Sequence, residues 1–268
     1  MIIKFHKVNL KKKFPLQISR GVHSESQNVF IEIIEDGITA WGESAPGKTE
    51  GATSAIEVEE ALVNLIEEGI EGLSIYEVSQ KAKELKVPPC ALAGLDIALW
   101  DLKAKKAKLQ LNDLLGIPKP STPTSITVGI NPPEIVKERV GLILKNKQVK
   151  AIKIKLGSPN GIEYDKEIYS QVFESTKSAN VLIRVDANGG WALDDAKEMT
   201  KWLSERNAEY IEQPLAEGNE DQLKFLFKGR SLPIFVDESL RFSEDVPRLA
   251  NFVDGVNLKL MKCGGITE

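Results

Sequence analysis

The sequence predicts an α/β protein in which a parallel (β/α)-barrel follows a smaller α+β domain. Two observations indicate the barrel. After residue 124, short apolar strands alternate with amphipathic helices, a pattern that requires parallel strands joined by right-handed crossovers. Five successive strands also end in charged side chains, and a barrel collects its active-site residues at this end of the strands. A third observation separates the domains, because residues 118–125 (PKPSTPTS) have the composition of a linker. We therefore expect domains at residues 1–123 and 124–268.

The first domain combines a strand, a hairpin and three helices. Ile2–Leu10 alternates apolar and polar residues, as a half-buried strand does, and residues 29–44 predict a hairpin that turns at Asp36-Gly37. Two stretches rich in glycine, proline and serine are expected to be loops: Phe14–Asn28 and Glu43–Thr53. Helices are expected at Ala55–Glu68, Ile75–Leu85 and Pro89–Ala107. The last of these is apolar on nearly every side, which predicts a buried helix.

The second domain contains six predicted strands, at residues 124–130, 151–157, 181–187, 209–214, 233–239 and 253–260. Five helices connect them: Pro132–Lys147, Ile162–Ala179, Leu193–Asn207, Asp221–Lys228 and Glu244–Ala250. Charged residues at the strand ends favour a barrel over a doubly wound sheet, but six strands do not close an eight-stranded barrel of roughly 250 residues. We therefore interpret the barrel as incomplete, with about six of eight strands present, and the chain as truncated after Glu268.

Composition excludes several classes of protein. The net charge is −4, and no block of like charge exceeds Lys11–Lys13, so the sequence carries no nucleic-acid or membrane footprint. No apolar run approaches ~20 residues, and the N-terminus lacks the apolar core of a signal peptide. The two cysteines lie far apart, which predicts reduced thiols and a cytoplasmic protein. Both histidines lie near the N-terminus, so lysines and carboxylates must perform any chemistry in the second domain.

Five motifs at the strand ends carry a family resemblance: IKIKLG, RVDANGGW, YIEQP, FVDES and NLKLMKCGGI. Together they resemble the enolase superfamily, more closely its muconate-lactonising subgroup, and within that subgroup the dipeptide epimerases. The segment LAGLDIALWDLKAKK is similar to the subgroup's capping-domain helix. The resemblance implies an α+β capping domain on the barrel, and a reaction in which Mg²⁺ assists removal of a proton α to a carboxylate.

Three carboxylates from consecutive strand units form the expected metal site. Asp186, Glu212 and Asp237 are hard oxygen ligands of the kind that Mg²⁺ prefers, and such a cation would stabilise an ene-diolate. The resemblance makes these three residues the metal ligands and gives Asn188 and Glu238 a supporting role around the metal or its water. Any one of the carboxylates could instead cap the helix that follows it, but three in succession favour the metal site.

Three lysines, Lys153, Lys155 and Lys262, are the expected catalytic residues, with Lys153 disfavouring protonation of its neighbour Lys155. Lys153 and Lys155 lie two residues apart on one strand, so both side chains point into the barrel. A lysine is a poor base at its usual pKa of about 10.4 and must be desolvated or placed beside another cation. The resemblance implies Lys155 as the base on one face of the substrate and Lys262 as the acid or base on the other. Taken alone, the position of Lys262 favours an exposed lysine in a turn over a catalytic residue, and Lys259 is assigned no primary role.

The substrate contacts are expected from the first domain and the first barrel strand. In the family that the chain resembles, the loops around Gly21 and Gly47 would close over the barrel mouth. Arg20 is a candidate for contacting a side-chain carboxylate of the substrate, and Thr127 could reach the same pocket. The Asp-x-Asp pair of the eighth strand, which in family dipeptide epimerases holds the substrate's ammonium group, has no counterpart in this sequence.

The expected function is Mg²⁺-dependent epimerisation of a small dipeptide by two lysines, in a homo-oligomer. Three alternatives share the chemistry: a cycloisomerase, an o-succinylbenzoate synthase and an N-acylamino-acid racemase. An alternative of another class is an inactive fragment that serves only in binding or assembly.

Overall fold

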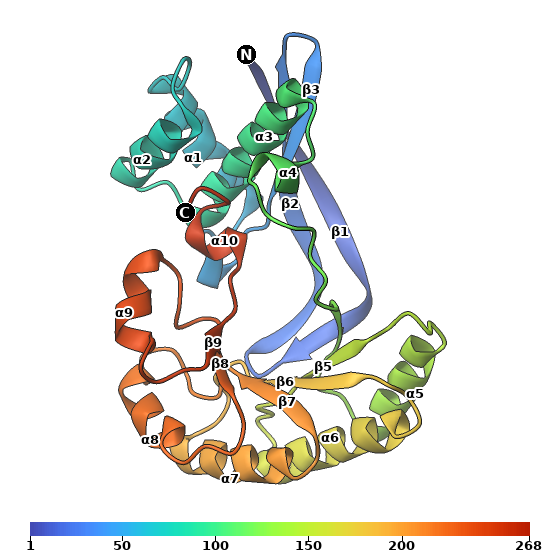
Figure 1. Ribbon diagram of the computed structural model, residues 1–268. Coiled ribbons are helices and arrows are strands. Elements are labelled where there is room, and N and C mark those ends of the chain that lie inside the picture. The colour runs from blue at the N-terminus through green and yellow to red at the C-terminus, as the bar shows by residue number, and fades with distance from the viewer.

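The computed structural model describes residues 1–268, and Figure 1 shows an upper and a lower part linked by a long hairpin. The upper part contains a three-stranded antiparallel sheet in the order β1-β2-β3, with β1 at Ile2–Ile18, β2 at Gly21–Glu35 and β3 at Ile38–Ser44. Its helices are α1 (Ala55–Glu67), α2 (Ile75–Glu84), α3 (Pro89–Ala107) and the short α4 (Leu111–Leu114). The predicted α+β domain is therefore confirmed. No helix of the chain has both the length and the apolar character needed to cross a membrane.

The predicted loop at Phe14–Asn28 is wrong. These residues belong to β1 and β2, which pair from Ile2↔Ile34 to Ile18↔Gly21 and turn at Ser19-Arg20. The register shifts between Lys11 and Leu16, and this irregularity accommodates Pro15, which cannot donate to the ladder. The segment is polar because much of this ribbon is exposed, and its hydrogen bonds come from strand pairing.

The helices of the upper part begin where the sequence provides capping side chains. Ser54 accepts a hydrogen bond from the amide of Glu57 at the start of α1, and Ser74 forms a reciprocal capping box with Glu77 at the start of α2. Helix α3 packs against β2 and β3 and supplies much of a core of 18 buried apolar residues. The prediction that this helix is buried is confirmed.

The lower part is a six-stranded parallel sheet in the sequential order β4 to β9, as predicted. Its strands are β4 (Ser125–Val128), β5 (Ala151–Lys155), β6 (Leu182–Asp186), β7 (Ala208–Glu212), β8 (Ile234–Val236) and β9 (Gly255–Val256). Figure 1 shows the strands curving inside a layer of helices, and β4 and β9 remain the two edges, so the barrel does not close. A core of 28 buried apolar residues lies between the sheet and the helices.

The connecting helices are shorter than predicted: α5 (Pro133–Leu144), α6 (Ile162–Thr176), α7 (Leu193–Ser204), α8 (Leu223–Phe227) and α9 (Val246–Leu249). A final turn, α10, covers Leu260–Cys263. Turns end these helices, and positive φ angles at Asn207 and Gly229 mark two of the turns. Helices α8 and α9 also begin later than predicted, because a 3₁₀ turn precedes each of them.

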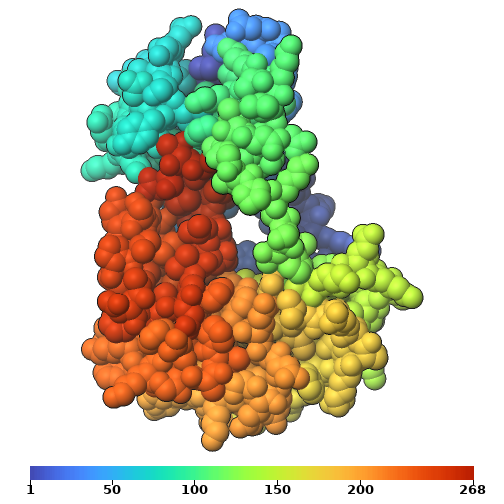
Figure 2. Space-filling view, in the orientation of Figure 1, coloured from blue at the N-terminus to red at the C-terminus, as the bar shows by residue number.

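Two contacts join the upper and lower parts. The tip of the β1–β2 hairpin reaches the strand ends of the sheet, where the amide of Ile130 donates to the Gln17 carbonyl at 2.9 Å. The last residues return to α3, where the buried Asp96 accepts from the amides of Ile266 (2.5 Å) and Thr267 (3.2 Å). Figure 2 shows an opening between the C-terminal segment, in red, and the segment that leads into the parallel sheet, in green.

Candidate active site

The three predicted carboxylates meet at the carboxyl end of the parallel sheet. Asp186 and Glu212 are the last residues of β6 and β7, which place them side by side, and Asp237 directly follows β8. All three side chains are buried. Each offers an oxygen that lies within 4.8 Å of the corresponding oxygens of the other two. Three carboxylates converge here because parallel strands end at one edge of the sheet.

Buried charges of both signs determine the electrostatics of this cluster. Burial favours the neutral form of Asp186, but the nearby Lys155 and Lys153 outweigh it and hold the pKa of Asp186 below its usual range. Burial and the charge of Asp186 raise the pKa of Glu212, and Lys153 offsets this only in part. The residues around Glu212 therefore do not fully stabilise its charged form.

The residues of the cluster fit a hard divalent cation. Three carboxylate oxygens within reach of one point are suitable ligands for Mg²⁺, which retains water at its remaining positions. Two buried acceptors, Asn188 Oδ1 and Glu238 Oε2, lack a hydrogen-bond donor in the protein. A metal-bound water could donate to such acceptors.

The side chains of Lys153 and Lys155 point to the inner face of the curved sheet, as their spacing predicts. The Nζ of Lys155 lies 2.6 Å from Asp186 Oδ2. The Nζ of Lys153 lies 2.6 Å from Glu212 Oε2 and 3.1 Å from Asp186 Oδ2. Burial disfavours the charge on Lys153, but the two carboxylates outweigh burial and raise its pKa. Lys153 is therefore held as a cation inside the cluster.

Lys259 and Lys262 contact Asp237 from different sides. The Nζ of Lys259 lies 2.7 Å from Asp237 Oδ2, and its side chain is 38% exposed. Lys262 is only 1% exposed, and its Nζ lies 2.5 Å from Asp237 Oδ1. This amine also donates to the carbonyls of Asp237, of Leu240 at 2.9 Å and of Asn257 at 3.3 Å. The N–H donors of Lys262 are thus bound to groups of the protein, whereas the side chain of Lys259 is accessible to solvent.

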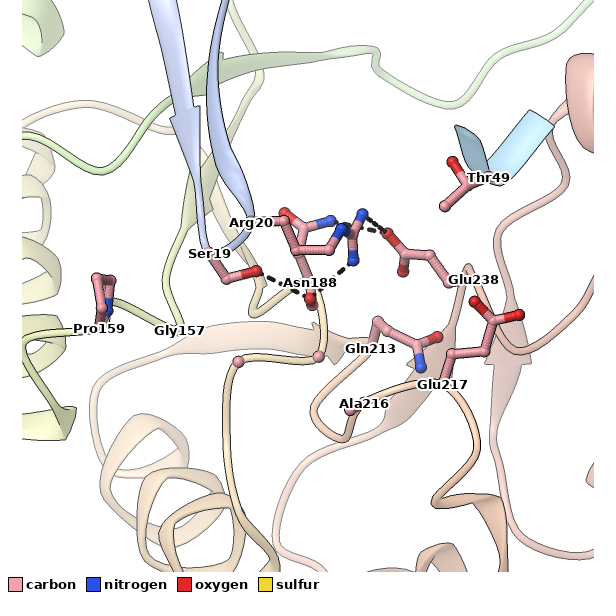
Figure 3. A pocket seen from close by; sticks show the side chains of 12 residues that line it. Ser19, Arg20, Thr49, Gly157, Pro159, Asn188, Gln213, Ala216, Glu217 and Glu238 are labelled. Carbon is pink, nitrogen blue, oxygen red and sulfur yellow. Dashed lines mark hydrogen bonds and ion pairs between the residues drawn. The ribbon is translucent and has the colours of Figure 1, made fainter. Parts of the chain in front are cut away.

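Arg20 crosses from the hairpin tip to the edge of the carboxylate cluster. Its guanidinium donates to the Asn188 carbonyl at 2.9 Å and to Glu238 Oε1 at 2.5 Å, and Ser19 donates to the same carbonyl. Figure 3 shows these side chains around a cavity of about 500 Å³. Asn188 also donates to Glu238 Oε1 at 3.2 Å, so the structure brings Arg20, Asn188 and Glu238 together.

Thr127 lies apart from this cavity. It pairs in register with Lys153 and lines a second cavity, of about 340 Å³, on the inner face of the sheet. Lys153 and Glu212 also line that cavity, so Thr127 approaches the carboxylate cluster from below the strand ends.

Three polar residues that support the site were not predicted from the sequence. Asn257 donates to Glu212 Oε1 at 2.9 Å, and Gln213 bridges the loops after β7 and β8. Asp165, fully buried on α6, accepts from the amides of Gly157 and Ser158 and from Trp191 Nε1 at 2.8 Å. Asn257 and Gln213 share a signal that could have revealed them, since each is a polar residue placed directly at a strand end.

A capping α+β domain, a parallel α/β domain and a carboxylate–lysine cluster at the strand ends define a class of enzyme, the enolase superfamily. Residues 2–116 match the model of the "Mandelate racemase / muconate lactonizing enzyme, N-terminal domain", and residues 136–268 match "Enolase C-terminal domain-like". The chain belongs to this mandelate racemase/muconate lactonizing enzyme family, as the predicted resemblance implies.

Similar proteins within the family are named epimerases. A hydrophobic dipeptide epimerase of Flavobacteria bacterium (strain MS024-2A) is 60% identical over 264 residues, which cover 98% of this chain and 76% of the relative. One of Roseobacter litoralis is 53% identical, covering 100% of this chain and 77% of the relative. The crystal structure of the dipeptide epimerase from Cytophaga hutchinsonii, complexed with Mg and the dipeptide D-Ala-L-Val, superposes with a TM-score of 0.90 at 30% identity, covering 99% of this chain and 73% of that chain.

Proposed function

We propose that this protein is a Mg²⁺-dependent dipeptide epimerase. It removes the proton α to a carboxylate and returns a proton to the opposite face of the same carbon. One observation carries the proposal: the buried cluster of Asp186, Glu212 and Asp237 has a lysine amine at each end, Lys155 beside Asp186 and Lys259 beside Asp237. The names of the relatives at 53% and 60% identity support the same activity.

The chain's own residues have distinct roles in this proposal. Asp186, Glu212 and Asp237 hold the cation, which supplies positive charge to the substrate carboxylate as the α-proton leaves. Asn188 and Glu238 accept hydrogen bonds at the edge of the metal site. Lys153 stays protonated between Asp186 and Glu212 and adds fixed positive charge. The division into residues 1–123 and 124–268 is part of the same proposal.

We propose Lys155 and Lys259 as the two proton-transfer groups, in place of the expected pair of Lys155 and Lys262. Both amines of the proposed pair lie at the carboxylate cluster, and Lys259 has access to the space outside it. Lys262 donates to three carbonyls and is buried, so it has no free donor to offer a substrate. We propose instead that Lys262 fixes the conformation of Asp237.

Proton exchange in deuterated water tests this assignment. Lys155→Ala and Lys259→Ala should each lower epimerisation by about 10²–10⁴-fold, the usual contribution of a general acid or base. Each variant should still exchange the α-proton of one stereoisomer, the one that faces its remaining lysine, and the two variants should prefer opposite stereoisomers. If Lys259→Ala retains exchange of both stereoisomers, Lys259 is not a proton-transfer group.

Near-normal turnover in Lys259→Arg would favour a one-base reaction such as cycloisomerisation, because arginine keeps the charge but does not release its proton.

We propose that the substrate is a dipeptide with apolar side chains. The expected role of Arg20 was to bind a side-chain carboxylate, but its guanidinium already pairs with Glu238 at 2.5 Å. Glu217 and Glu238 line the adjacent cavity and disfavour a second anionic group there. We therefore propose that Arg20 fixes the hairpin tip. We propose that Thr127 contributes to the cavity below the metal site, which Lys153 and Glu212 also line. Initial rates for L-Ala-L-Leu and L-Ala-L-Glu test the proposal, and faster epimerisation of the acidic dipeptide would contradict it.

We also propose a homo-oligomer. Strand β1 pairs only with β2 and so presents a long free edge that a second copy could cover. Sedimentation of the wild type and of Val8→Lys, which places a charge on this strand, compares the association states. A wild type that sediments as a monomer at all concentrations would contradict the proposal.

A further inference from the structure

Gln213 has an unusual backbone conformation at a critical position. It directly follows Glu212, is 2% exposed and has a φ of 42°, a left-handed value that non-glycine residues seldom adopt. Its amide donates to the Phe235 carbonyl on β8, and its carbonyl accepts from the amide of Gly189 in the loop after β6, both at 2.8 Å. The backbone of Gln213 therefore joins the ends of β6, β7 and β8.

The side chain of Gln213 adds four bonds to the loops after β7 and β8. Its Oε1 accepts from the amides of Asp237 at 2.9 Å and Ser239 at 3.3 Å. Its Nε2 donates to the Leu215 carbonyl and to Ser239 Oγ, both at 2.8 Å. These bonds use both donors and both acceptor positions of the primary amide. Ser239 continues the network by donating to Glu220 at 2.7 Å.

We propose that Gln213 is the positioning residue of the metal site, because it sets the spacing of the three ligand-bearing strand ends. Its backbone fixes Glu212, its side chain fixes the amide of Asp237, and its carbonyl holds the loop that begins at Asp186. In Figure 3 the side chain lies below Glu238 in the pocket. The inference rests on the proposed function only in requiring a cation at the three carboxylates, and it is independent of the substrate.

No other side chain offers the same set of bonds. Glutamate has the length of glutamine but lacks the two donors that reach Leu215 and Ser239. Asparagine has the same amide and tolerates a positive φ, but it is one methylene too short to reach Asp237 and Leu215 together. The surrounding bonds also explain why glutamine keeps a left-handed φ here, since such conformations persist only where the structure determines them.

The test compares Gln213→Asn and Gln213→Glu with the matched control Gln148→Asn, which makes the same change at an exposed residue far from the site. Calorimetric titration with Mg²⁺ and electron paramagnetic resonance with Mn²⁺ measure metal affinity, and thermal melting without metal measures folding. Both Gln213 variants should melt cooperatively without metal but bind Mg²⁺ about 10- to 100-fold more weakly, the range found for groups that orient metal ligands. The control should bind Mg²⁺ as the wild type does.

Folded Gln213 variants with wild-type Mg²⁺ affinity would overturn the proposal. If both fail to fold, Ser239→Ala removes one partner of the amide and leaves Gln213 in place. This variant should bind Mg²⁺ several-fold more weakly, and unchanged affinity would again overturn the proposal. A wild type that binds no Mg²⁺ would instead contradict the proposed function, so the two failures are distinguishable.

Discussion

The upper and lower parts of the molecule differ in how much charge they bury, since Asp96, which contacts the last residues, is the one buried acid of the upper part. The upper part surrounds an apolar core with exposed ion pairs, such as Lys7–Glu59, which typically contribute only about 0–1 kcal/mol. The lower part buries Asp186, Glu212, Asp237 and Lys262 at its strand ends. Burying charge costs several kcal/mol per ion before pairing offsets it. We infer that the upper part contributes mainly to stability, whereas the proposed function accounts for the costly buried charges of the lower part.

Removing a carboxylate from the lower part should have the largest effect on function. We expect Glu212→Gln to weaken Mg²⁺ binding and to lower epimerisation by at least about 10²-fold, more than the loss of a group that only orients a ligand. Titration with Mg²⁺ and turnover at high Mg²⁺ measure the two effects. Full turnover after exhaustive chelation of the wild type would contradict the role of the cluster altogether.

Replacing Lys262 should test whether a buried charge of the lower part contributes to the free energy of unfolding. Lys262→Met leaves Asp237 without its buried partner, so we expect the free energy of unfolding to fall by about 3–5 kcal/mol. Chemical denaturation measures this loss, with Lys259→Met as the matched control at the more exposed lysine. Equal destabilisation by both variants would show that the two lysines are not divided between stability and catalysis.

A substitution that creates a cavity in the core of the upper part should lower the free energy of unfolding without changing the affinity for Mg²⁺. Leu95 on α3 is fully buried in the apolar core, so Leu95→Ala should destabilise by about 2–5 kcal/mol. The exposed change Lys7→Ala should alter stability by less than about 1 kcal/mol. Denaturation with and without Mg²⁺ measures both, and a weaker Mg²⁺ affinity in folded Leu95→Ala would show that the two parts are coupled.

The smallest effect should come from Asp96, the buried acid where the upper part receives the last residues. Burial raises the pKa of Asp96, although bonds from Thr267 and Ile266 oppose it. A carboxyl with a raised pKa in the folded state stabilises most below its unfolded pKa of about 3.9, and this stability is lost as pH rises through the folded pKa. The wild type should therefore lose stability relative to Asp96→Asn as pH rises from about 4. Melting of both proteins across this range checks the sign, and a relative gain would refute it.

Regular features of the fold were predictable from the sequence. The six strands of the lower part and the buried helix α3 follow from hydrophobic patterns, and all three carboxylates converge as predicted. The long hairpin was not predicted, because Pro15 and the serines of β2 resemble loop residues until strand pairing satisfies their backbone. The supporting role of Asp165 depends on its contacts with the loops after β5 and β6, which no local pattern contains.

The sequence by itself determined which charged residues lie at the strand ends, because each short apolar run stops at charged residues and the ends of parallel strands meet at one edge of the sheet. Only the tertiary structure decided how Lys259 and Lys262 differ. They stand three residues apart, and the turn α10, which begins directly after Lys259 and contains Lys262, directs Lys262 back to buried carbonyls while Lys259 stays accessible beside Asp237. Because Lys259 and Lys262 are so close in sequence, their local sequence patterns are nearly the same. Their different burial therefore depends on the path that the chain takes among the packed strand ends.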